Sequence, residues 1–259
     1  MRRDARETRG LTLVEVLVVI ATLGVLAAML CSALGSAAAR GRRTICLANV
    51  RQINQDVSMY AADNHDLLFP LRARPDRFRE VINDQEWTSY VPLIGRYVGW
   101  TEKSAPQDKL FACPADSFFL GADSRHQSYW ASESHHSQSN MNYSSYLFNA
   151  ANAVFQGPVR AKFPNLFPGV LGWRLNSIRA PTRTLLLGET PAWDAYSWHS
   201  PSQPRRAYVN NALDMLGFAD GHGSYVKIYF DDLHYPPGLP RAVFAFDPPP
   251  GYEYQWSGN

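Results

Sequence analysis

The chain carries very little net charge for its length. Its 259 residues include 25 Lys and Arg against 23 Asp and Glu, which leaves a formal charge of +2. A surplus this small argues against a nucleic-acid-binding protein, because such proteins carry a marked excess of basic side chains. Hydrophobic residues make up 46% of the chain, which excludes an intrinsically disordered protein.

Sequence motifs of the common enzyme classes are also missing. The chain contains no Gly-x-Ser-x-Gly elbow, no His-Glu-x-x-His helix, no P-loop and no dinucleotide-binding glycine pattern. Cys113 is not surrounded by a catalytic-cysteine signature. We therefore expect a protein that is not an enzyme, and we expect neither a cofactor nor a resident metal ion.

The basic excess lies in the first ten residues, which hold four Arg against one Asp and one Glu. Residues 11–34 follow as a 24-residue apolar stretch without proline and with one charged residue, Glu15. A helix needs about 20 residues to cross the hydrocarbon layer of a bilayer, so this stretch predicts a transmembrane helix. A signal peptide cleaved near the small residues 36–39 is the alternative interpretation.

Glu15 is the unusual residue of the apolar stretch. A carboxylate costs up to about 2.5 to 3.5 kcal/mol at the centre of a bilayer and less near its edge, so it usually has a partner. The stretch contains neither Lys nor Arg. A new amino terminus, created by cleavage between Gly10 and Leu11, would supply such a partner in the same chain or in a neighbouring subunit.

Residues 9–15, with the sequence RGLTLVE, resemble the N-terminal segment of bacterial type IV prepilins and type II secretion pseudopilins. The resemblance implies that a prepilin peptidase cuts after Gly10 and methylates Leu11, and that Glu15 guides the packing of subunits. Leu11 stands where phenylalanine is commonest in that family. The implied partners are the prepilin peptidase, other pilin or pseudopilin subunits and the inner membrane, and no nucleic acid is among them.

The arginines on the two sides of the apolar stretch do not decide its orientation. Four precede it, and Arg40, Arg42, Arg43 and Arg51 follow it closely. The prepilin resemblance places residues 1–10 in the cytoplasm as a leader. It implies a single-pass protein of the bacterial inner membrane, with its globular domain in the periplasm or outside the cell.

The pattern beyond residue 34 predicts an α+β fold. Apolar residues recur at three- and four-residue steps within residues 35–63, which predicts an amphipathic stalk helix with one buried face. Its stripe consists of Cys46, Val50, Ile53, Val57, Tyr60 and Ala61. Residues 64–259 form the predicted globular domain. We expect a pilin-like arrangement in which the long N-terminal helix packs on a small antiparallel sheet with large loop insertions.

Strands are predicted from short apolar or alternating runs at residues 109–112, 143–148, 184–187, 215–219 and 224–230. Asp220-Gly221 separates the last two runs and predicts a hairpin turn. A second helix is expected around residues 87–97, interrupted by Pro92. Residues 121–145 are predicted to form a polar loop, and residues 247–259 an irregular tail that is frayed or packed on the surface.

Later segments resemble large pseudopilin-like proteins with a C-terminal motif of His, nine residues and Asp-Gly. Residues 111–114 (FACP) and 218–222 (FADGH) match blocks of that subfamily. Asp220, Gly221 and His222 fit the end of the motif, but Asn210 occupies the histidine position. An asparagine cannot titrate near neutral pH, so an acid-base or metal-binding role for this motif is weakened here.

Two of the three cysteines, Cys46 and Cys113, lie outside the apolar stretch, where a disulfide is permitted if the domain is extracytoplasmic. A bridge would close a loop of about 68 residues and stabilise the fold by about 4 kcal/mol. The sequence cannot show whether the two Cα atoms approach each other, so bridged and free cysteines both stay open.

Calcium is a second open question, because some secretion pseudopilins hold it near the end of their domain. The candidate ligands are Asp214, Asp220, His222, Asp231, Asp232 and His234. Their spacing matches no calcium loop, and a turn accounts for Asp220-Gly221, so we favour a structural role.

The leading functional hypothesis is a structural subunit of a type II secretion pseudopilus or of a type IV pilus-like assembly. The alternative is a membrane-tethered binding module for a polysaccharide or a protein, which the large loops favour. Its test residues would be Trp130, Trp193, Trp198 and Trp256.

Overall fold

The computed structural model describes residues 12–70, 85–100, 104–122, 128–131, 133–154, 168–200, 209–230 and 247–259. The predicted cleavage residues Gly10 and Leu11 lie outside these ranges. The chain divides into two compact units, which are Met1–Gly41 and Arg42–Asn259.

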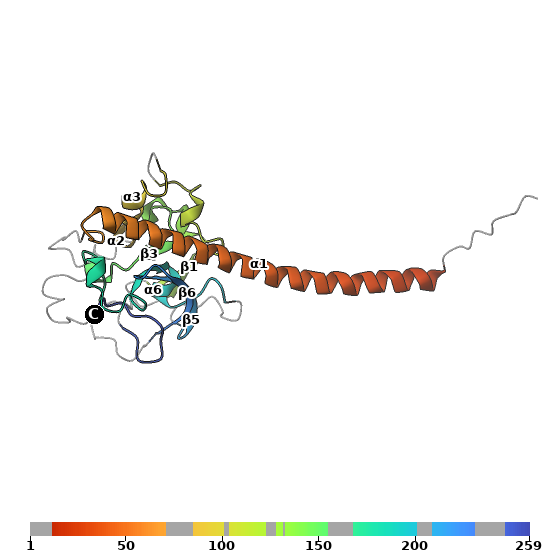
Figure 1. Ribbon diagram of the computed structural model, residues 1–259. Helices are drawn as coiled ribbons and strands as arrows, with labels where there is room; N and C mark the ends of the chain where they lie inside the picture. Colours follow the sequence, from red (N-terminus) through yellow and green to blue (C-terminus); the bar gives the residue numbers. More distant parts are fainter. Residues whose placement is uncertain are drawn as a thin grey trace, which may run out of the picture. The chain divides into compact units, whose positions relative to one another are not determined.

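One uninterrupted helix, α1 (Leu13–Asp63), contains both predicted helical segments (Figure 1). Gly35 and Gly41 lie inside it and do not break it. The helix is followed by a turn in which His65 and Asp66 have positive φ angles of 55° and 65°. The Asn64 side chain donates a hydrogen bond of 2.7 Å to the carbonyl of Tyr60 and so satisfies one of the free carbonyls at the helix end.

The first part of α1 exposes almost all of its large apolar side chains. Leu13 is 83% exposed and Leu34 is 59% exposed, and the residues between them show the same pattern. Among the described residues, α1 is the one helix that is long and apolar enough to cross a membrane.

Residues 42–63 of α1 pack on the sheet through the predicted stripe. Cys46, Val50, Ile53, Val57 and Ala61 are fully buried, which confirms the amphipathic pattern. Asn54 is buried as well, although its polarity suggested an outward position.

The sheet has an opening for the Asn54 side chain, because Gly217 has no Cβ there. A Cβ atom at Gly217 would lie 2.5 Å from the Asn54 amide nitrogen. That nitrogen donates hydrogen bonds of 3.1 and 3.2 Å to the carbonyls of Phe218 and His222. Buried polar groups are tolerated when they are hydrogen-bonded, so Asn54 ties the helix to the end of the hairpin.

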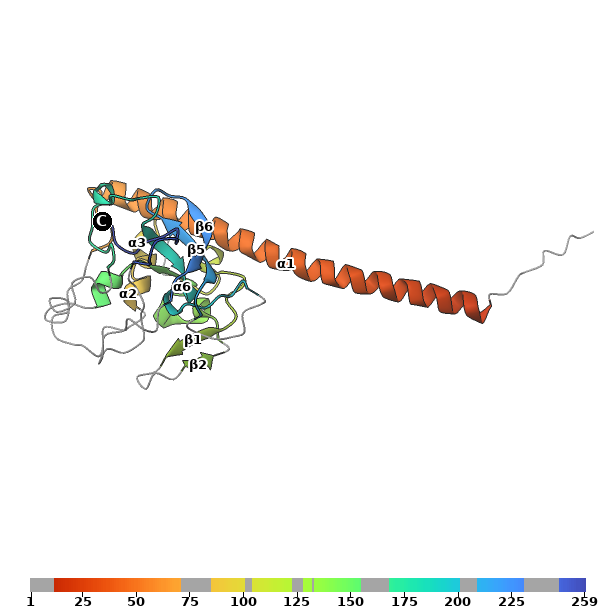
Figure 2. The ribbon, with the colours of Figure 1, turned by 90° about the horizontal axis from the view of Figure 1, so that it is seen from below.

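The sheet has four antiparallel strands in the order β3-β4-β5-β6. They are β3 (Tyr146–Phe148), β4 (Leu185–Glu189), β5 (Ala212–Phe218) and β6 (Gly223–Ile228). Figures 1 and 2 show β5 and β6 alongside the C-terminal part of α1. Val226 and Ile228 of β6 are buried while Lys227 is exposed, as the alternating pattern predicts. The long helix and the small antiparallel sheet confirm the α+β class.

The predicted turn at Asp220-Gly221 joins β5 and β6. Gly221 has a φ of 92°, a conformation that glycine adopts without the cost a side chain would add. The Gly221 amide donates a hydrogen bond of 2.9 Å to the carbonyl of Phe218, which closes the turn.

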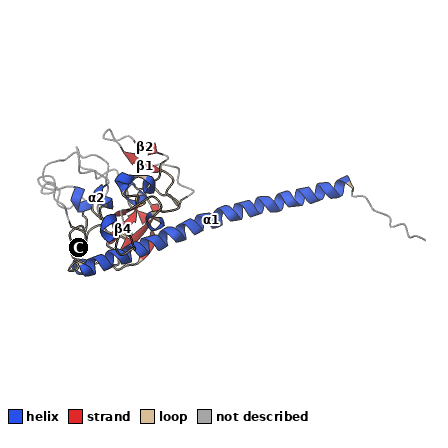
Figure 3. Cartoon of the chain, turned by 90° about the horizontal axis from the view of Figure 1, so that it is seen from above, coloured by secondary structure: helices blue, strands red, loops and turns tan. Residues whose placement is uncertain are grey.

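Two local predictions were wrong. Residues 109–112 do not form a strand but include the 3-10 helix η1 (Lys109–Phe111), because so short an apolar run has no periodicity that separates the two. The polar segment 121–145 also contains regular structure. A two-stranded hairpin, β1 (Phe119–Ala122) with β2 (Ser128–Ala131), lies away from α1 in Figures 2 and 3.

The other elements are single turns of helix. The expected helix over residues 87–97 is split into α2 (Gln85–Thr88) and α3 (Val91–Ile94), with Pro92 in the first turn of the second, where its missing N–H costs nothing. The remaining turns are η2 (His135–Ser137), η3 (Ser139–Met141), α4 (Ala151–Val154), η4 (Leu175–Ser177) and α6 (Pro191–Asp194).

The C-terminal segment is irregular, as predicted, but two of its aromatic side chains lie in the core and not on the surface. Tyr254 and Trp256 are each 1% exposed. The Trp256 ring meets that of Trp193 edge-on at 5.1 Å, and the main chain forms a parallel bridge between Thr184 and Gln255. The predicted surface position was wrong because Pro, Gly and aromatic composition reports irregular backbone and says nothing about burial.

Candidate functional site

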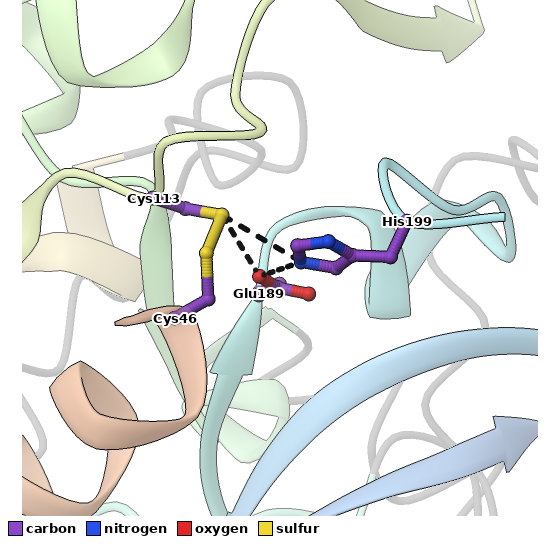
Figure 4. A group of neighbouring side chains, drawn as sticks. All are labelled: Cys46, Cys113, Glu189 and His199. Carbon is purple, nitrogen blue, oxygen red and sulfur yellow. Dashed lines mark hydrogen bonds and ion pairs between the residues drawn. A yellow bond between two sulfur atoms is a disulfide. The ribbon is translucent and has the colours of Figure 1, made fainter. Parts of the chain in front are cut away.

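Four buried side chains with chemically reactive groups converge beside the stalk helix (Figure 4). Cys46 comes from α1, Cys113 follows η1, Glu189 is the last residue of β4, and His199 lies in the loop after α6. One sulfur, oxygen or nitrogen atom of each lies within 4.8 Å of the corresponding atom of the others. We call this group the Cys-Glu-His cluster.

The two cysteines of the cluster are joined by a disulfide. Their Cα atoms are 5.1 Å apart, inside the usual range for a bridge, and 67 positions separate them in the sequence. Both residues are buried. The disulfide therefore links the stalk helix covalently to the globular domain. Of the two alternatives left open by the sequence, bridged or free cysteines, the structure has the bridge.

Glu189 is completely buried and is oriented by its neighbours. Its Oε2 atom accepts a hydrogen bond of 3.2 Å from the backbone amide of Met215. Its Oε1 atom accepts a hydrogen bond of 2.8 Å from Nε2 of His199 and lies 3.1 Å from Sγ of Cys113. One carboxylate oxygen is thus held by the sheet and the other faces the imidazole and the sulfur.

Charged groups surround the cluster. The Arg43 guanidinium donates a hydrogen bond to the carbonyl of His199 and lies over the ring of Tyr225, 5.2 Å from its centre. Asp214, on β5, is completely buried, and neither of its carboxylate oxygens has a hydrogen-bond partner among the described residues. Burial first, and the nearby Glu189 carboxylate second, raise the pKa of Asp214 well above its usual range, which favours the neutral acid.

A third buried carboxyl group, that of Asp116, holds the loop that carries His135 and His136. It accepts hydrogen bonds of 3.1 and 3.0 Å from the backbone amides of these two residues, and one of 2.7 Å from the Ser145 hydroxyl. Burial raises the pKa of Asp116 to about 6 in spite of these hydrogen bonds, which lower it.

Asp116 makes the stability of the domain depend on pH. Its folded pKa is higher than its unfolded pKa, so the folded state binds the proton more tightly between about pH 4 and 6. We expect this carboxyl to remove about 3 kcal/mol of unfolding free energy as the pH rises through that window. Asp116→Asn should abolish the loss. Urea unfolding of the detergent-solubilised chain at pH 4 and pH 6 measures the difference between the two proteins.

His135 acts in the opposite sense and supplies a second arm of this experiment. Burial lowers the pKa of His135 from its ordinary value of 6.5 to about 4. The stability that the neutral imidazole contributes is therefore lost as the pH falls from about 6.5 to about 4. His135→Gln should therefore remove a loss that occurs on acidification. His65 is exposed, and His65→Gln is the matched control for replacing a histidine with glutamine. Parallel pH profiles for wild type and Asp116→Asn would contradict the assignment.

Glu15 has a hydrogen-bonding partner within its own chain. Its Oε2 atom accepts hydrogen bonds of 2.8 Å from both the backbone amide and the hydroxyl of Thr12, and its amide donates to the Thr12 hydroxyl at 3.3 Å. Thr12 and Glu15 thus form a capping box at the start of α1. From the sequence, a new amino terminus was predicted as the partner of this carboxylate, and the Thr12 partner was not. The two roles use different neighbours and are not exclusive.

The residues of the Asp-Gly motif lie at the surface. Asn210 accepts hydrogen bonds from the Tyr252 hydroxyl at 3.1 Å and from the Phe230 amide at 3.3 Å. His222 stacks on Phe218 with ring centres 4.3 Å apart, and its Nδ1 bonds to Asp220. Asn210 thus joins β6 to the C-terminal segment, while Asp220 and His222 stabilise the turn around Gly221.

Of the proposed calcium ligands that the structure describes, Asp214 lies apart from the contacting pair Asp220 and His222. Asp214 is buried inside β5, whereas Asp220 and His222 lie six and eight residues further along at the turn. Six residues of strand span about 20 Å, too far for one ion. The other three candidates, Asp231, Asp232 and His234, lie outside the described residues.

The tryptophans suggested as a ligand surface are mainly packing residues. Trp193 and Trp256 are 4% and 1% exposed and form part of the core. The Trp198 ring donates a hydrogen bond of 2.7 Å to the carbonyl of Phe118. The side chain of Trp130 lies outside what the structure describes. A carbohydrate platform needs exposed rings, so Trp193 and Trp256 do not support the binding-module hypothesis.

The sequence analysis did not single out Glu189 or His199 as site residues. Glu189 was visible only as a polar residue that ends an apolar run, and His199 was one of seven histidines. Neither has a motif, because the cluster is assembled from four segments that are far apart in the chain. The available signal in the sequence was an acidic residue at the end of an otherwise apolar run, residues 185–188.

Comparison of the chain with protein-family models, with curated proteins and with solved structures found no match. Its function is therefore inferred from its own residues and geometry.

Proposed function

We propose that this chain is a structural subunit of a type II secretion pseudopilus or a type IV pilus-like assembly in the bacterial inner membrane. A prepilin peptidase removes residues 1–10 after Gly10 and methylates Leu11. The apolar part of α1 then anchors the subunit in the bilayer, with the globular domain in the periplasm or outside the cell. Assembly transfers that part of the helix from lipid to neighbouring copies.

The observation that carries this proposal is the change of environment along α1. Its first part exposes a continuous apolar surface, and its last part buries one face against a sheet. An exposed apolar surface of this extent requires a covering, and lipid and the helices of other copies are the two that fit its length. The RGLTLVE segment in front of this helix favours a pilin-like use of the anchor.

Sequencing the amino terminus of the membrane-bound protein tests the processing step. We expect a chain that begins at N-methylated Leu11 when prepilin peptidase is co-expressed, and one that begins at Met1 when it is not. A chain that begins after residues 36–39 would show a cleaved signal peptide and would contradict both the anchor and the assembly.

Substitutions at Glu15 separate its charge from its role in the capping box. A glutamine at this position still satisfies a capping box, whereas alanine does not. Removing one partner of a buried ion pair costs about 3 to 5 kcal/mol, and 1.4 kcal/mol is a tenfold change in an equilibrium constant. We therefore expect Glu15→Gln and Glu15→Ala to insert into the membrane normally and to enter fibres at least about tenfold less than wild type.

Thr12→Ala is the matched control, because it removes the cap and keeps the carboxylate. We expect it to assemble nearly as wild type does. Quantitative blotting of sheared fibre fractions against membrane fractions measures all three variants. Normal incorporation of Glu15→Gln into fibres would contradict the role of the carboxylate charge and leave Glu15 only its role as a helix cap.

A further inference from the structure

The short contact between Glu189 and Cys113 is not a hydrogen bond while the disulfide is present. Oε1 of Glu189 lies 3.1 Å from Sγ of Cys113, but a sulfur in a disulfide has no proton to donate. The two oxygens of the buried Glu189 carboxylate are held by the Met215 amide and by His199, so the sulfur contact adds no hydrogen bond, and a disulfide needs neither an acid nor an imidazole beside it. A metal ion that accepts both sulfur and oxygen ligands could bind to Cys113 and Glu189 together.

One of the three distances within the Cys-Glu-His cluster falls in the range of a tetrahedral zinc site, and the two that involve Glu189 are shorter by about 0.2 and 0.5 Å, so the Glu189 side chain would have to move back slightly to admit an ion. Zinc ligands at about 2.0 to 2.3 Å from the metal are about 3.3 to 3.8 Å from one another. In the cluster, Sγ of Cys113 lies 3.7 Å from Nε2 of His199 and 3.1 Å from Oε1 of Glu189. The Glu189 and His199 atoms are 2.8 Å apart. Two thiolates, an imidazole and a carboxylate are all established zinc ligands.

The groups behind the ligands already hold them in place. The Met215 amide fixes the other oxygen of Glu189, and the Arg43 side chain bonds to the carbonyl of His199. The backbone amide of Ala115 lies 3.4 Å from Sγ of Cys113 and donates to it. Hydrogen bonds of this kind orient metal ligands and stabilise negative charge on sulfur.

Charge balance favours zinc over bare thiolates. Reduction of the disulfide and ionisation of both cysteines would place two negative charges in a buried site beside the Glu189 carboxyl group. A divalent cation cancels exactly those two charges, so a zinc dithiolate has the same net charge as the disulfide it replaces.

We propose that Cys46, Cys113, Glu189 and His199 bind one Zn²⁺ ion when the disulfide is reduced, so that metal and disulfide are alternative links between α1 and the domain. A dithiol reductant supplies two electrons and two protons, is itself oxidised to a disulfide, and leaves two cysteine thiols. Zinc then displaces the two thiol protons. His199 coordinates through Nε2 as the neutral tautomer with its proton on Nδ1.

The experiment uses the full-length chain in detergent with Cys31→Ala, which removes the third cysteine. One sample is oxidised, and the other is treated with a dithiol and freed of it without oxygen. We expect one Zn²⁺ per reduced chain, with a dissociation constant below about 100 nM, and none per oxidised chain. Co²⁺ as a probe should give thiolate charge-transfer absorption and the intense visible bands of tetrahedral coordination.

Variants assign the ligands. Cys46→Ser and Cys113→Ser should each weaken the thiolate absorption and lower zinc affinity. Glu189→Gln and His199→Asn should keep the thiolate absorption and lower zinc affinity at least about tenfold. His222→Ala is the matched control, since His222 pairs with Asp220 at the surface and lies outside the cluster. Its affinity should equal that of the unsubstituted chain.

Three results would overturn the proposal. The first is a reduced chain that remains folded by circular dichroism and binds no stoichiometric zinc. The second is a metal bound elsewhere. A Co²⁺ spectrum that lacks thiolate bands would show this, and so would zinc binding that Cys46→Ser leaves unchanged. The third is a reduced chain that unfolds and is not refolded by zinc.

Discussion

Replacing both disulfide cysteines, with Cys46→Ala and Cys113→Ala together, should lower the unfolding free energy by about 4 kcal/mol. The bridge spans 67 positions, and a loop of this size restricts the unfolded chain by about that amount in the chain-entropy description. The total unfolding free energy of a folded protein is about 5 to 15 kcal/mol, so this loss would be a large fraction of it. Urea unfolding of the chain in detergent, with metal chelator present, measures the change.

The third cysteine provides the control for that measurement. Cys31 is free and exposed on the apolar part of α1, so Cys31→Ala should leave the urea midpoint unchanged. Reduction of the wild-type chain in chelator should lower the midpoint as far as the double substitution does. A double variant with the midpoint of wild type would show that the bridge does not restrain the unfolded chain.

Trp256→Ala should cost about 3 to 5 kcal/mol, the range for removing a large buried aromatic side chain. The ring is 1% exposed, contacts the ring of Trp193 at 5.1 Å and lies near that of Tyr254. The main chain is fixed as well, since the Asn149 amide donates a hydrogen bond of 2.8 Å to the Trp256 carbonyl. The same urea titration detects the loss.

A neighbouring exposed residue shows whether the effect comes from burial. Glu253 lies in the same segment and is exposed, so Glu253→Ala should change the unfolding free energy by less than about 0.5 kcal/mol. A loss below about 1 kcal/mol for Trp256→Ala would mean that the C-terminal segment can detach from the core without unfolding it. In that case the tail predicted from composition would be the better description.

Local patterns predicted the parts of the fold whose cause is local. The buried stripe of α1 follows from three- and four-residue spacing, and β6 follows from the alternation around Val226 and Ile228. The turn at Gly221 follows from the need for a positive φ. The hairpin of β1 and β2 was missed because each of its strands has only four residues, too few to show an apolar alternation.

The candidate site was beyond sequence reasoning for a different reason. Cys46, Cys113, Glu189 and His199 meet only after the helix has packed on the sheet, and their contacts span up to 153 positions of the chain. No local spacing encodes such an arrangement. Glu15 shows the reverse case, in which the partner is local. Its charge was noticed in the sequence, but the Thr12 hydroxyl three positions away was not predicted as its partner.

The position of the disulfide along α1 has a mechanical consequence. Cys46 is the first fully buried residue met on moving along α1 from Leu13 towards the sheet. Tension applied to the Leu13 end would otherwise peel the helix from the sheet one contact at a time, starting at Cys46. A covalent bond at the leading edge blocks peeling, so Val50, Ile53 and the residues beyond them could yield only by shearing together. The first part of α1 can then bear tension without separating the rest of the helix from the sheet.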